Sequence, residues 1–188
     1  TVRPNNNSGG TKAPSKKRRD QAKKMQALIA AAADDELLCF MDGSHDVLRN
    51  RTGGGLSIWM AGSPALRLSF ALGDSTNNEA ELFTIGVCVE QVHRWLEDGS
   101  LPISTRLSLF TDSEYSHDII VNGNTPHSNI HLIHHIIRKI TSLHNDYPDF
   151  HAELHWLPGH LNIDGNEDAG GLAKLGAKNA VSSHPLNS

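Results

Sequence analysis

Two apolar, β-rich segments of this chain each end on an aspartate, and a turn or a helical pattern follows at once. The first segment ends on Asp42 and the second ends on Asp112. A long amphipathic helix predicted over 76–97 carries Glu81 close to its start. Because strand ends and helix starts can meet at one edge of a sheet, we expect the three carboxylates to converge. Carboxylates bind hard divalent cations such as Mg²⁺, so the pattern predicts a metal-dependent site for phosphodiester hydrolysis.

Hydrophobic periodicity predicts strands and helices over most of the chain. The predicted strands are 36–42, 54–61, 65–73, 106–111 and 151–157, and the predicted helices are 76–97, 113–121, 128–145 and 166–179. The segments Gly53-Gly-Gly55 and Gly62-Ser-Pro64 have turn-forming residues and predict the turns that link the first three strands. Antiparallel hairpins followed by βαβ units predict an α/β fold, with a five-stranded mixed sheet and helices on both faces.

Length and composition indicate one soluble domain. A chain of 188 residues, 38% of them hydrophobic, is large enough to bury a core. No long apolar run or signal peptide is present, which argues against a membrane span and against secretion. Cys39 and Cys88 have neither metal-ligand nor disulfide spacing. We therefore expect an intracellular protein, nuclear or cytoplasmic, with two free thiols packed in its core.

Positive charge is concentrated at the N-terminus. Residues 1–24 carry eight basic groups and one acidic group, whereas the rest of the chain carries nine basic and twenty acidic groups. We expect residues 1–34 to form a basic flexible tail or linker, with a short helix that docks loosely or connects to an upstream domain. A solvated linker, a nucleic-acid-holding arm and a nuclear import signal are alternative roles for this tail. The domain itself is expected at 35–180, and 181–188 form a C-terminal tail.

Four motifs, in order, resemble those of ribonuclease H type 1. They are Asp42-Gly-Ser44, Thr76-Asn-Asn-Glu-Ala-Glu81, Thr111-Asp-Ser-Glu-Tyr115, and Trp156-Leu-Pro-Gly-His160 with Gly165-Asn-Glu167. The last is similar in particular to the ribonuclease H domains of retroelement (retrotransposon) polyproteins. The resemblance implies a ribonuclease H-like fold, hydrolysis of the RNA strand of an RNA–DNA hybrid, and an upstream reverse transcriptase domain in the parent polyprotein. It also implies a monomeric isolated domain.

The resemblance further implies roles for individual residues. Asp42 would bridge two Mg²⁺ ions, for which Mn²⁺ can substitute, and Glu81 and Asp112 would join it around the ion on the leaving-group side. His160 would move a proton or help to release product from a loop beside the centre. Contacts with the nucleic acid are expected from polar and glycine positions near these acids: Gly43, Ser44, Asn77, Asn78, Ser113 and Asn166. For Asn77 and Asn78, helix capping alone is an alternative explanation.

Glu79 competes with Glu81 for the metal-binding role. The two lie two residues apart on a helix, about 200° around it, so they cannot both face the sheet. Glu81 has the offset from the paired asparagines that matches the family motif. Glu79 is therefore expected to be an exposed acid of the first turn, favoured by the helix dipole, with Thr76 or Ser75 as the N-cap.

The chain departs from the family at Gly170. In the family, the last helix carries a fourth metal-binding aspartate four residues after the asparagine that here is Asn166. Asp168 lies about 200° away on the helix, whereas Glu167 can come closer from one turn below. The ion on the nucleophile side should therefore be weakly held and activity reduced or lost. Two explanations of the glycine at position 170 are an inactivating substitution and descent from a decayed element copy.

A catalytically inactive module that binds a hybrid or a partner domain is the main alternative to a nuclease. DNA strand transfer on the same fold is less well supported, because the motifs match the nuclease branch.

Four histidines lie close together in one predicted helix and at its start: His127, His131, His134 and His135. Three roles remain open for them, namely a solvated polar face, a weak hybrid-binding surface and a metal site, although the metal site has no clear third ligand.

Overall fold

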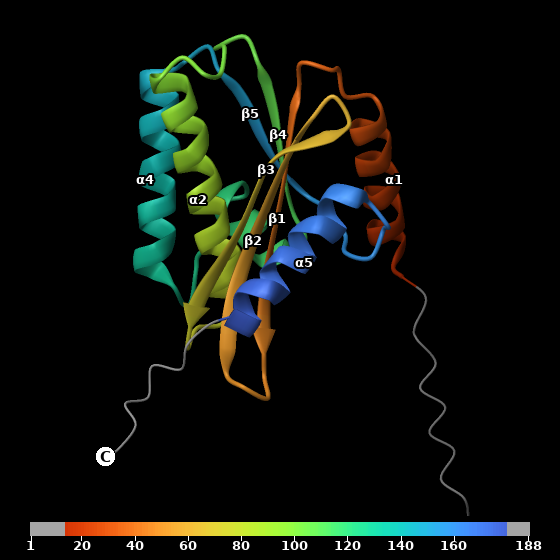
Figure 1. The fold of residues 1–188 in the computed structure, drawn as a ribbon, viewed down its shortest axis with the longest axis vertical. Coiled ribbons are helices and arrows are strands. Elements are labelled where there is room, and N and C mark those ends of the chain that lie inside the picture. Colours follow the sequence, from red (N-terminus) through yellow and green to blue (C-terminus); the bar gives the residue numbers. More distant parts are fainter. Residues whose placement is uncertain (1–13, 180–188) are drawn as a thin grey trace, which may run out of the picture.

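The computed structural model describes residues 14–179, which form one open β-sheet flanked by helices (Figure 1). In chain order the elements are α1 (Lys16–Ala30), β1 (Leu37–Asp46), β2 (Arg51–Met60), β3 (Ser63–Gly73), α2 (Asn77–Glu97), β4 (Arg106–Thr111), α3 (Glu114–Ile120), α4 (Ile130–Asp146), β5 (His151–Trp156) and α5 (Asp164–Asn179). The predicted C-terminal tail at 181–188 and residues 1–13 of the predicted N-terminal tail lie outside the described residues. Within 14–179, no helix is long and apolar enough to cross a membrane.

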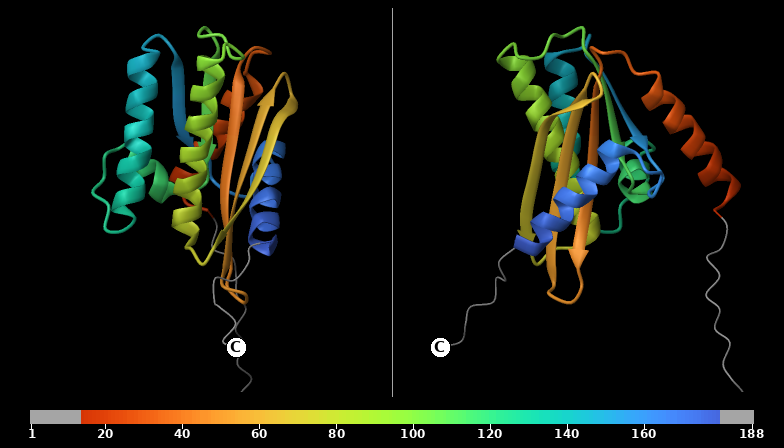
Figure 2. Two further views of the ribbon diagram at one scale, coloured as in Figure 1. Left: turned by 60° about the vertical axis from the view of Figure 1, so that its left-hand side comes forward. Right: turned by 45° about the vertical axis from the view of Figure 1, so that its right-hand side comes forward.

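The five strands form a mixed sheet in the order β3-β2-β1-β4-β5. The β1–β2 and β2–β3 pairs are antiparallel, whereas the β1–β4 and β4–β5 pairs are parallel. Figure 2 shows α2 and α4 on one face of the sheet and α5 on the other. The predicted five-stranded mixed sheet with helices on both faces is therefore confirmed.

Alternating side chains of the central strands build one core on each face. Cys39 and Met41 of β1 pack into the larger core with α2 and α4, and both cysteines of the chain are buried and free. Phe40 points to the opposite face and stacks on Phe110 of β4, with the ring centroids 5.0 Å apart. Because side chains alternate along a strand, this pattern fixes the face that each following residue reaches.

Strands β1 and β2 extend further than the sequence predicted. β1 continues to Asp46 instead of ending at Asp42. Residues 53–55, which were predicted to form a turn, lie inside β2, and the chain turns at 47–50. The predicted turn immediately after Asp42 is therefore wrong, and Gly43 lies within a strand.

Close helix packing explains the glycines of this hairpin. A Cβ atom added at Gly53 or Gly55 would overlap the backbone of α5, and one at Gly43 would lie 2.9 Å from the backbone nitrogen of Glu81 in α2. Helices thus approach the hairpin from both faces at positions that lack a side chain. Glycine runs are also typical of turns, which is why the sequence pattern was misleading here.

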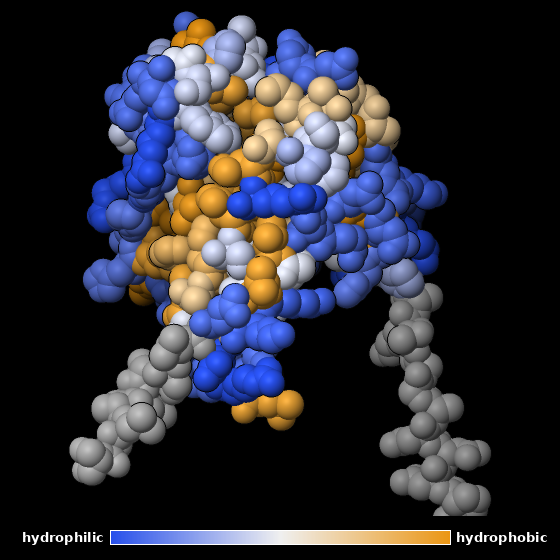
Figure 3. Space-filling model, viewed as in Figure 1, coloured by the Kyte–Doolittle hydropathy of each residue, from blue (hydrophilic) through white to orange (hydrophobic). Residues whose placement is uncertain are grey.

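Helix α1 packs firmly on the sheet. Its Met25 is 0% exposed and lies in the core on the α5 face, together with Phe40, Phe110, Leu157 and Ala169. The Nε2 atom of Gln21 donates a hydrogen bond to the carbonyl of Trp156 at 2.8 Å. The expectation of a loosely docked helix is therefore wrong, because residues 16–30 are held by a buried side chain. The outer surface of the N-terminal half of α1 is strongly hydrophilic (Figure 3).

Candidate active site

The register of the central strands brings Asp42 and Asp112 together. Phe40 of β1 lies opposite Phe110 of β4 in a parallel pair, and each aspartate follows its phenylalanine by two residues. Because side chains alternate along a strand, both carboxylates point to the face that holds α5. β4 ends at Thr111, so Asp112 lies just beyond the strand end, where the sheet opens beside β1.

Helix α2 brings Glu81 to the same place. Thr76 caps the helix: its side chain accepts from the backbone nitrogen of Glu79 at 3.2 Å, and the Glu79 carboxylate accepts from the backbone nitrogen of Thr76 at 3.0 Å. Glu81 is only 2% exposed, and its Oε2 accepts from Thr111 Oγ1 at 3.5 Å. The geometry therefore places Glu81 beside the aspartates and leaves Glu79 at the cap.

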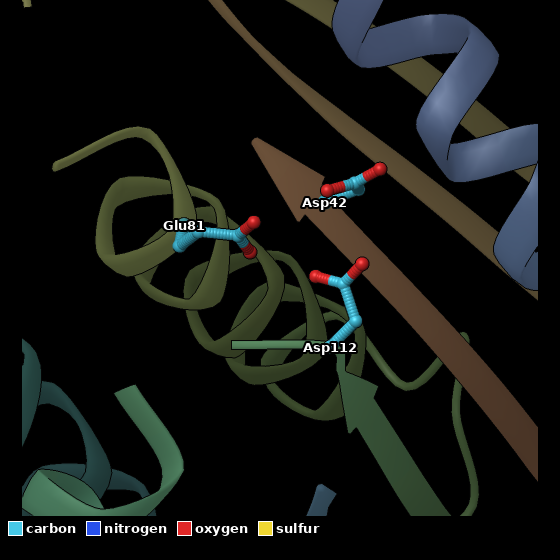
Figure 4. Close-up of side chains that lie close together, drawn as sticks. All are labelled: Asp42, Glu81 and Asp112. Carbon is cyan, nitrogen blue, oxygen red and sulfur yellow. The ribbon is translucent and has the colours of Figure 1, made fainter. Parts of the chain in front are cut away.

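Asp42, Glu81 and Asp112 point toward one another (Figure 4), and one oxygen of each lies within 4.8 Å of the others. Burial, followed by repulsion from Asp112, raises the pKa of Asp42 to about 7. Burial and the two aspartates raise the pKa of Glu81 well above its ordinary value. Carboxylates crowded in this way are unfavourable as anions unless a cation joins them. An all-oxygen set of this kind fits a hard divalent cation.

No second group of three potential metal ligands occurs among residues 14–179. The histidines at the start of α4 and along it do not form one, and they are exposed. Of the alternatives open for them from the sequence, the metal site therefore receives no support from the geometry.

Gly170 of α5 faces Asp42 of the acidic group. A Cβ atom there would lie 2.9 Å from Asp42 Oδ2, and no other atom beyond the local backbone of α5 would lie within 4 Å. By contrast, a Cβ atom at Gly165 or Gly176 of the same helix would overlap a phenylalanine ring or the backbone of β3. Packing therefore requires glycine at those two positions but not at Gly170. The position predicted for the fourth ligand does point into the centre, and it carries no carboxylate.

Neither acid close to Gly170 takes its place. Asp168 Oδ2 accepts from Ser57 Oγ at 2.6 Å and pairs with Arg67 Nε at 2.6 Å, on the β2–β3 side of α5. Glu167 is exposed and does not join the group of three acids.

The loop after β5 lies against Asp112. A Cβ atom at Gly159 would lie 3.3 Å from Asp112 Oδ2, and the next residue, His160, is exposed with a positive φ of 65°. Arg18 of α1 reaches the same loop and donates from Nη2 to the carbonyl of Gly159 at 3.1 Å. Burial raises the pKa of Asp112, while a hydrogen bond with Glu81 and then the charges of His160 and Arg18 oppose the rise. Sequence reasoning missed Arg18, because its contact joins residues 141 positions apart.

The sequence model of the RNase H family matches residues 34–178, which include all three acids and the loop. The chain belongs to the RNase H family. The resemblance inferred from the four motifs is thereby confirmed at the level of the family.

Solved RNase H structures share the fold. LC11-RNase H1, isolated from compost, has a TM-score of 0.61 at 18% identity, with 77% of this chain and 96% of that chain covered. LC11-RNase H1 in complex with an RNA/DNA hybrid also has a TM-score of 0.61, at 16% identity, covering 76% and 97%. The PFV RNase H domain has a TM-score of 0.59 at 20% identity, covering 78% and 96%.

The residues predicted to contact substrate occupy different environments around this RNase H centre. Asn77 and Asn78 are exposed in the first turn of α2, and Ser44 is half-buried in β1. Ser113 caps α3 by accepting from a backbone N–H at 3.1 Å. Asn166 is only 7% exposed, and its Oδ1 has no hydrogen-bond partner within the described part of the chain. The exposed asparagines are therefore available to a ligand, whereas Asn166 is enclosed at the start of α5.

Proposed function

We propose that this RNase H domain is a metal-dependent endonuclease that hydrolyses the RNA strand of RNA–DNA hybrids, with activity reduced by the missing carboxylate at Gly170. The observation that carries the proposal is the convergence of the buried Glu81 with the half-buried Asp42 and Asp112, with one oxygen of each within 4.8 Å of the others. The RNA/DNA hybrid bound by LC11-RNase H1, a structure of the same fold, supports the substrate class.

We assign Mg²⁺, with Mn²⁺ as a substitute, as the ion that the three acids hold. Two such ions supply an activated water and stabilise the leaving oxygen of an in-line displacement at phosphorus. We assign Asp42 to serve both sides of the centre, a role supported by its Oδ2, which is the atom that a Cβ at position 170 would meet. An ion on the α5 side would then lack a carboxylate from position 170 and would be held weakly.

His160 and the two asparagines of α2 have the exposure that their proposed roles require. His160 stands on the loop that lies against Asp112, where an imidazole can exchange a proton with water or with the leaving group. Asn77 and Asn78 each carry donors and an acceptor, which can contact 2′-hydroxyls and base edges in the shallow minor groove of a hybrid.

We further propose that the domain derives from the polyprotein of a reverse-transcribing element, with a reverse transcriptase domain upstream. The Gly-His and Gly-Asn-Glu segments at 159–160 and 165–167 support this origin. The fold shared with the PFV RNase H domain is consistent with it.

Gly170 favours one alternative, a domain that binds hybrids without cutting them. Three acids can hold an ion on one side of the centre while the other side lacks its ligand. Hybrid binding would then persist without hydrolysis.

A hybrid labelled on either strand distinguishes these functions. In Mg²⁺ or Mn²⁺ we expect cuts in the RNA strand, no cuts in the DNA strand, and none in duplex DNA of the same sequence. Asp42→Asn is the control, since cutting that survives this substitution comes from another nuclease. Binding without cutting in both ions would favour the alternative, and the absence of both would contradict the proposed function.

A further inference from the structure

Helix α1 carries four consecutive basic residues at its start, 16–19, and they have different surroundings. Lys17 pairs with Glu114 and lies 5.4 Å from the centroid of the Trp156 ring. Arg18 donates to the carbonyl of Gly159, and Arg19 donates to the carbonyl of Pro14 at 2.9 Å. Within residues 14–179, neither arginine has a carboxylate within 4.0 Å. Their charges are therefore not neutralised by an ion pair, in contrast to Lys17.

A groove of about 460 Å³ separates the start of α1 from the loop after β5. Its walls come from Arg18, Arg19 and Ala22 on one side and from Gly159, His160 and Leu161 on the other. No acidic residue of the described chain lines this groove. A concave surface with two guanidinium groups and an imidazole suits an anion, and a guanidinium can bind phosphate through two parallel hydrogen bonds.

The groove opens beside the three acids. A Cβ atom at Gly159 would lie 3.3 Å from Asp112 Oδ2 and 4.0 Å from Arg18 Nη2. The carboxylate and the guanidinium therefore lie on either side of Gly159, which has no side chain to fill the space between them. A strand that places one phosphate at the acids would therefore bring a neighbouring phosphate to Arg18.

Anchoring of the loop does not by itself require the charge of Arg18. Gln21, one turn further along α1, anchors the start of the same loop through its neutral amide, which donates to the Trp156 carbonyl at 2.8 Å. The carbonyl of Gly159 takes one N–H of Arg18, whereas a guanidinium has five. The remaining donors are available to a ligand in the groove.

We propose that Arg18, with Arg19 and His160, forms a binding subsite for a backbone phosphate of the RNA strand, next to the phosphate that is cut. The proposal rests on the proposed function, because it needs the strand to lie across the three acids. It makes α1 part of the substrate-binding surface, although α1 precedes the region that matches the RNase H family.

Binding of hybrids to the full chain in EDTA, where no cutting occurs, tests the subsite. Each hybrid carries one neutral 2′-O-methyl methylphosphonate at a different RNA position, with the charged 2′-O-methyl phosphate as its control. For the unsubstituted chain we expect one position at which the neutral linkage lowers affinity roughly tenfold, the size expected for a charge-assisted hydrogen bond. Arg18→Ala should lower affinity by a similar factor and should be insensitive to that linkage, because the partners form one pair.

Salt dependence gives a second readout. Loss of one phosphate contact should reduce the slope of log affinity against log salt by roughly 0.7–0.9 in Arg18→Ala, and Arg18→Lys should restore part of it. Gln21→Ala, which removes a neutral anchor of the same loop, and Arg94→Ala, on the distant α2 surface, should keep the original slope.

Two outcomes would overturn the subsite. If Arg18→Ala keeps the sensitivity to every methylphosphonate and the original slope, Arg18 only anchors the loop, and the proposed nuclease function is unaffected. If the unsubstituted chain binds no hybrid either in EDTA or in Mg²⁺, the subsite and the proposed function fail together.

Discussion

The two sides of the RNase H centre differ in charge although they share one scaffold. β1, β4 and α2 supply the acids Asp42, Glu81 and Asp112, whereas α5, the loop after β5 and α1 supply Gly170, His160 and Arg18. Helix α5 is closely packed on the sheet at Gly165 and Gly176, yet a side chain at position 170 would meet only Asp42. The packing of α5 therefore does not require a carboxylate at position 170, so a chain can retain the RNase H scaffold without one.

Removal of an acid should have the largest effect of the changes predicted for the two sides, and it should be seen in hybrid cleavage. Asp42→Asn should lower hybrid cleavage on the order of 1,000-fold or more, since even outer-shell partners of a metal cost roughly 10–100-fold. It should also abolish Mn²⁺ binding in a calorimetric titration. Glu79→Gln is the matched control, because Glu79 only caps α2, and it should leave both readouts intact. Loss of Mn²⁺ binding in Glu79→Gln but not in Glu81→Gln would reverse the assignment of the two glutamates.

On the opposite side, α1 should contribute to stability through Met25. Truncation of this fully buried side chain to Ala should cost about 3 kcal/mol of unfolding free energy, in the range found for buried methionines. Leu175→Ala, at an exposed position of α5, should cost less than about 0.5 kcal/mol. Urea denaturation measures both. Equal, small effects would mean that α1 does not contribute to the fold in solution.

Divalent cations should stabilise the protein more at pH 8 than at pH 5. The pKa of Asp42 is raised from 3.8 to about 7, so the stability gained by keeping its proton is present below pH 3.8 and is lost as the pH rises through 7. A cation replaces that proton, and at 100 times its dissociation constant it adds about 2.7 kcal/mol. Melting temperatures with and without Mn²⁺ measure the difference.

Asp42→Asn is the control for this pH dependence. It should raise the melting temperature of the metal-free protein at pH 8, because it removes a buried repulsion, and it should eliminate the gain from Mn²⁺. An equal Mn²⁺ effect at pH 5 and pH 8 in the unsubstituted chain would show that the acids are not the binding site.

Strand patterns predicted most of the acidic side. Asp42 and Asp112 come directly after apolar runs, each two residues after a phenylalanine, and parallel pairing of β1 with β4 brings these two positions close together. Helical geometry allows only one of Glu79 and Glu81 to face the sheet, and the offset from the paired asparagines in the family motif identified Glu81. Local periodicity fixed the direction of each aspartate, and the family motif supplied the choice of glutamate.

The opposite side depends on contacts that local patterns do not encode. Gly53 and Gly55 were predicted to lie in a turn, because the close approach of α5 that explains them comes from residues more than a hundred positions away. A short helix was predicted in the basic N-terminal segment, but its firm packing through the fully buried Met25 was not. The contact of Arg18 with Gly159 could be identified only from the fold, because the two residues lie far apart in the sequence. Gly170 is the exception, since its spacing from Asn166 in the family motif identified it in advance.

The rate of hybrid cleavage by Gly170→Asp, relative to the unsubstituted chain, tests the central claim most directly. A carboxylate added at this position faces Asp42 Oδ2 and should complete the ligand set, so we expect at least a tenfold increase in Mg²⁺, about 1.4 kcal/mol of activation free energy. Gly170→Asn, with the same size and no charge, should give a much smaller change. Equal rates for Gly170→Asp and the unsubstituted chain, with both proteins folded, would contradict the account.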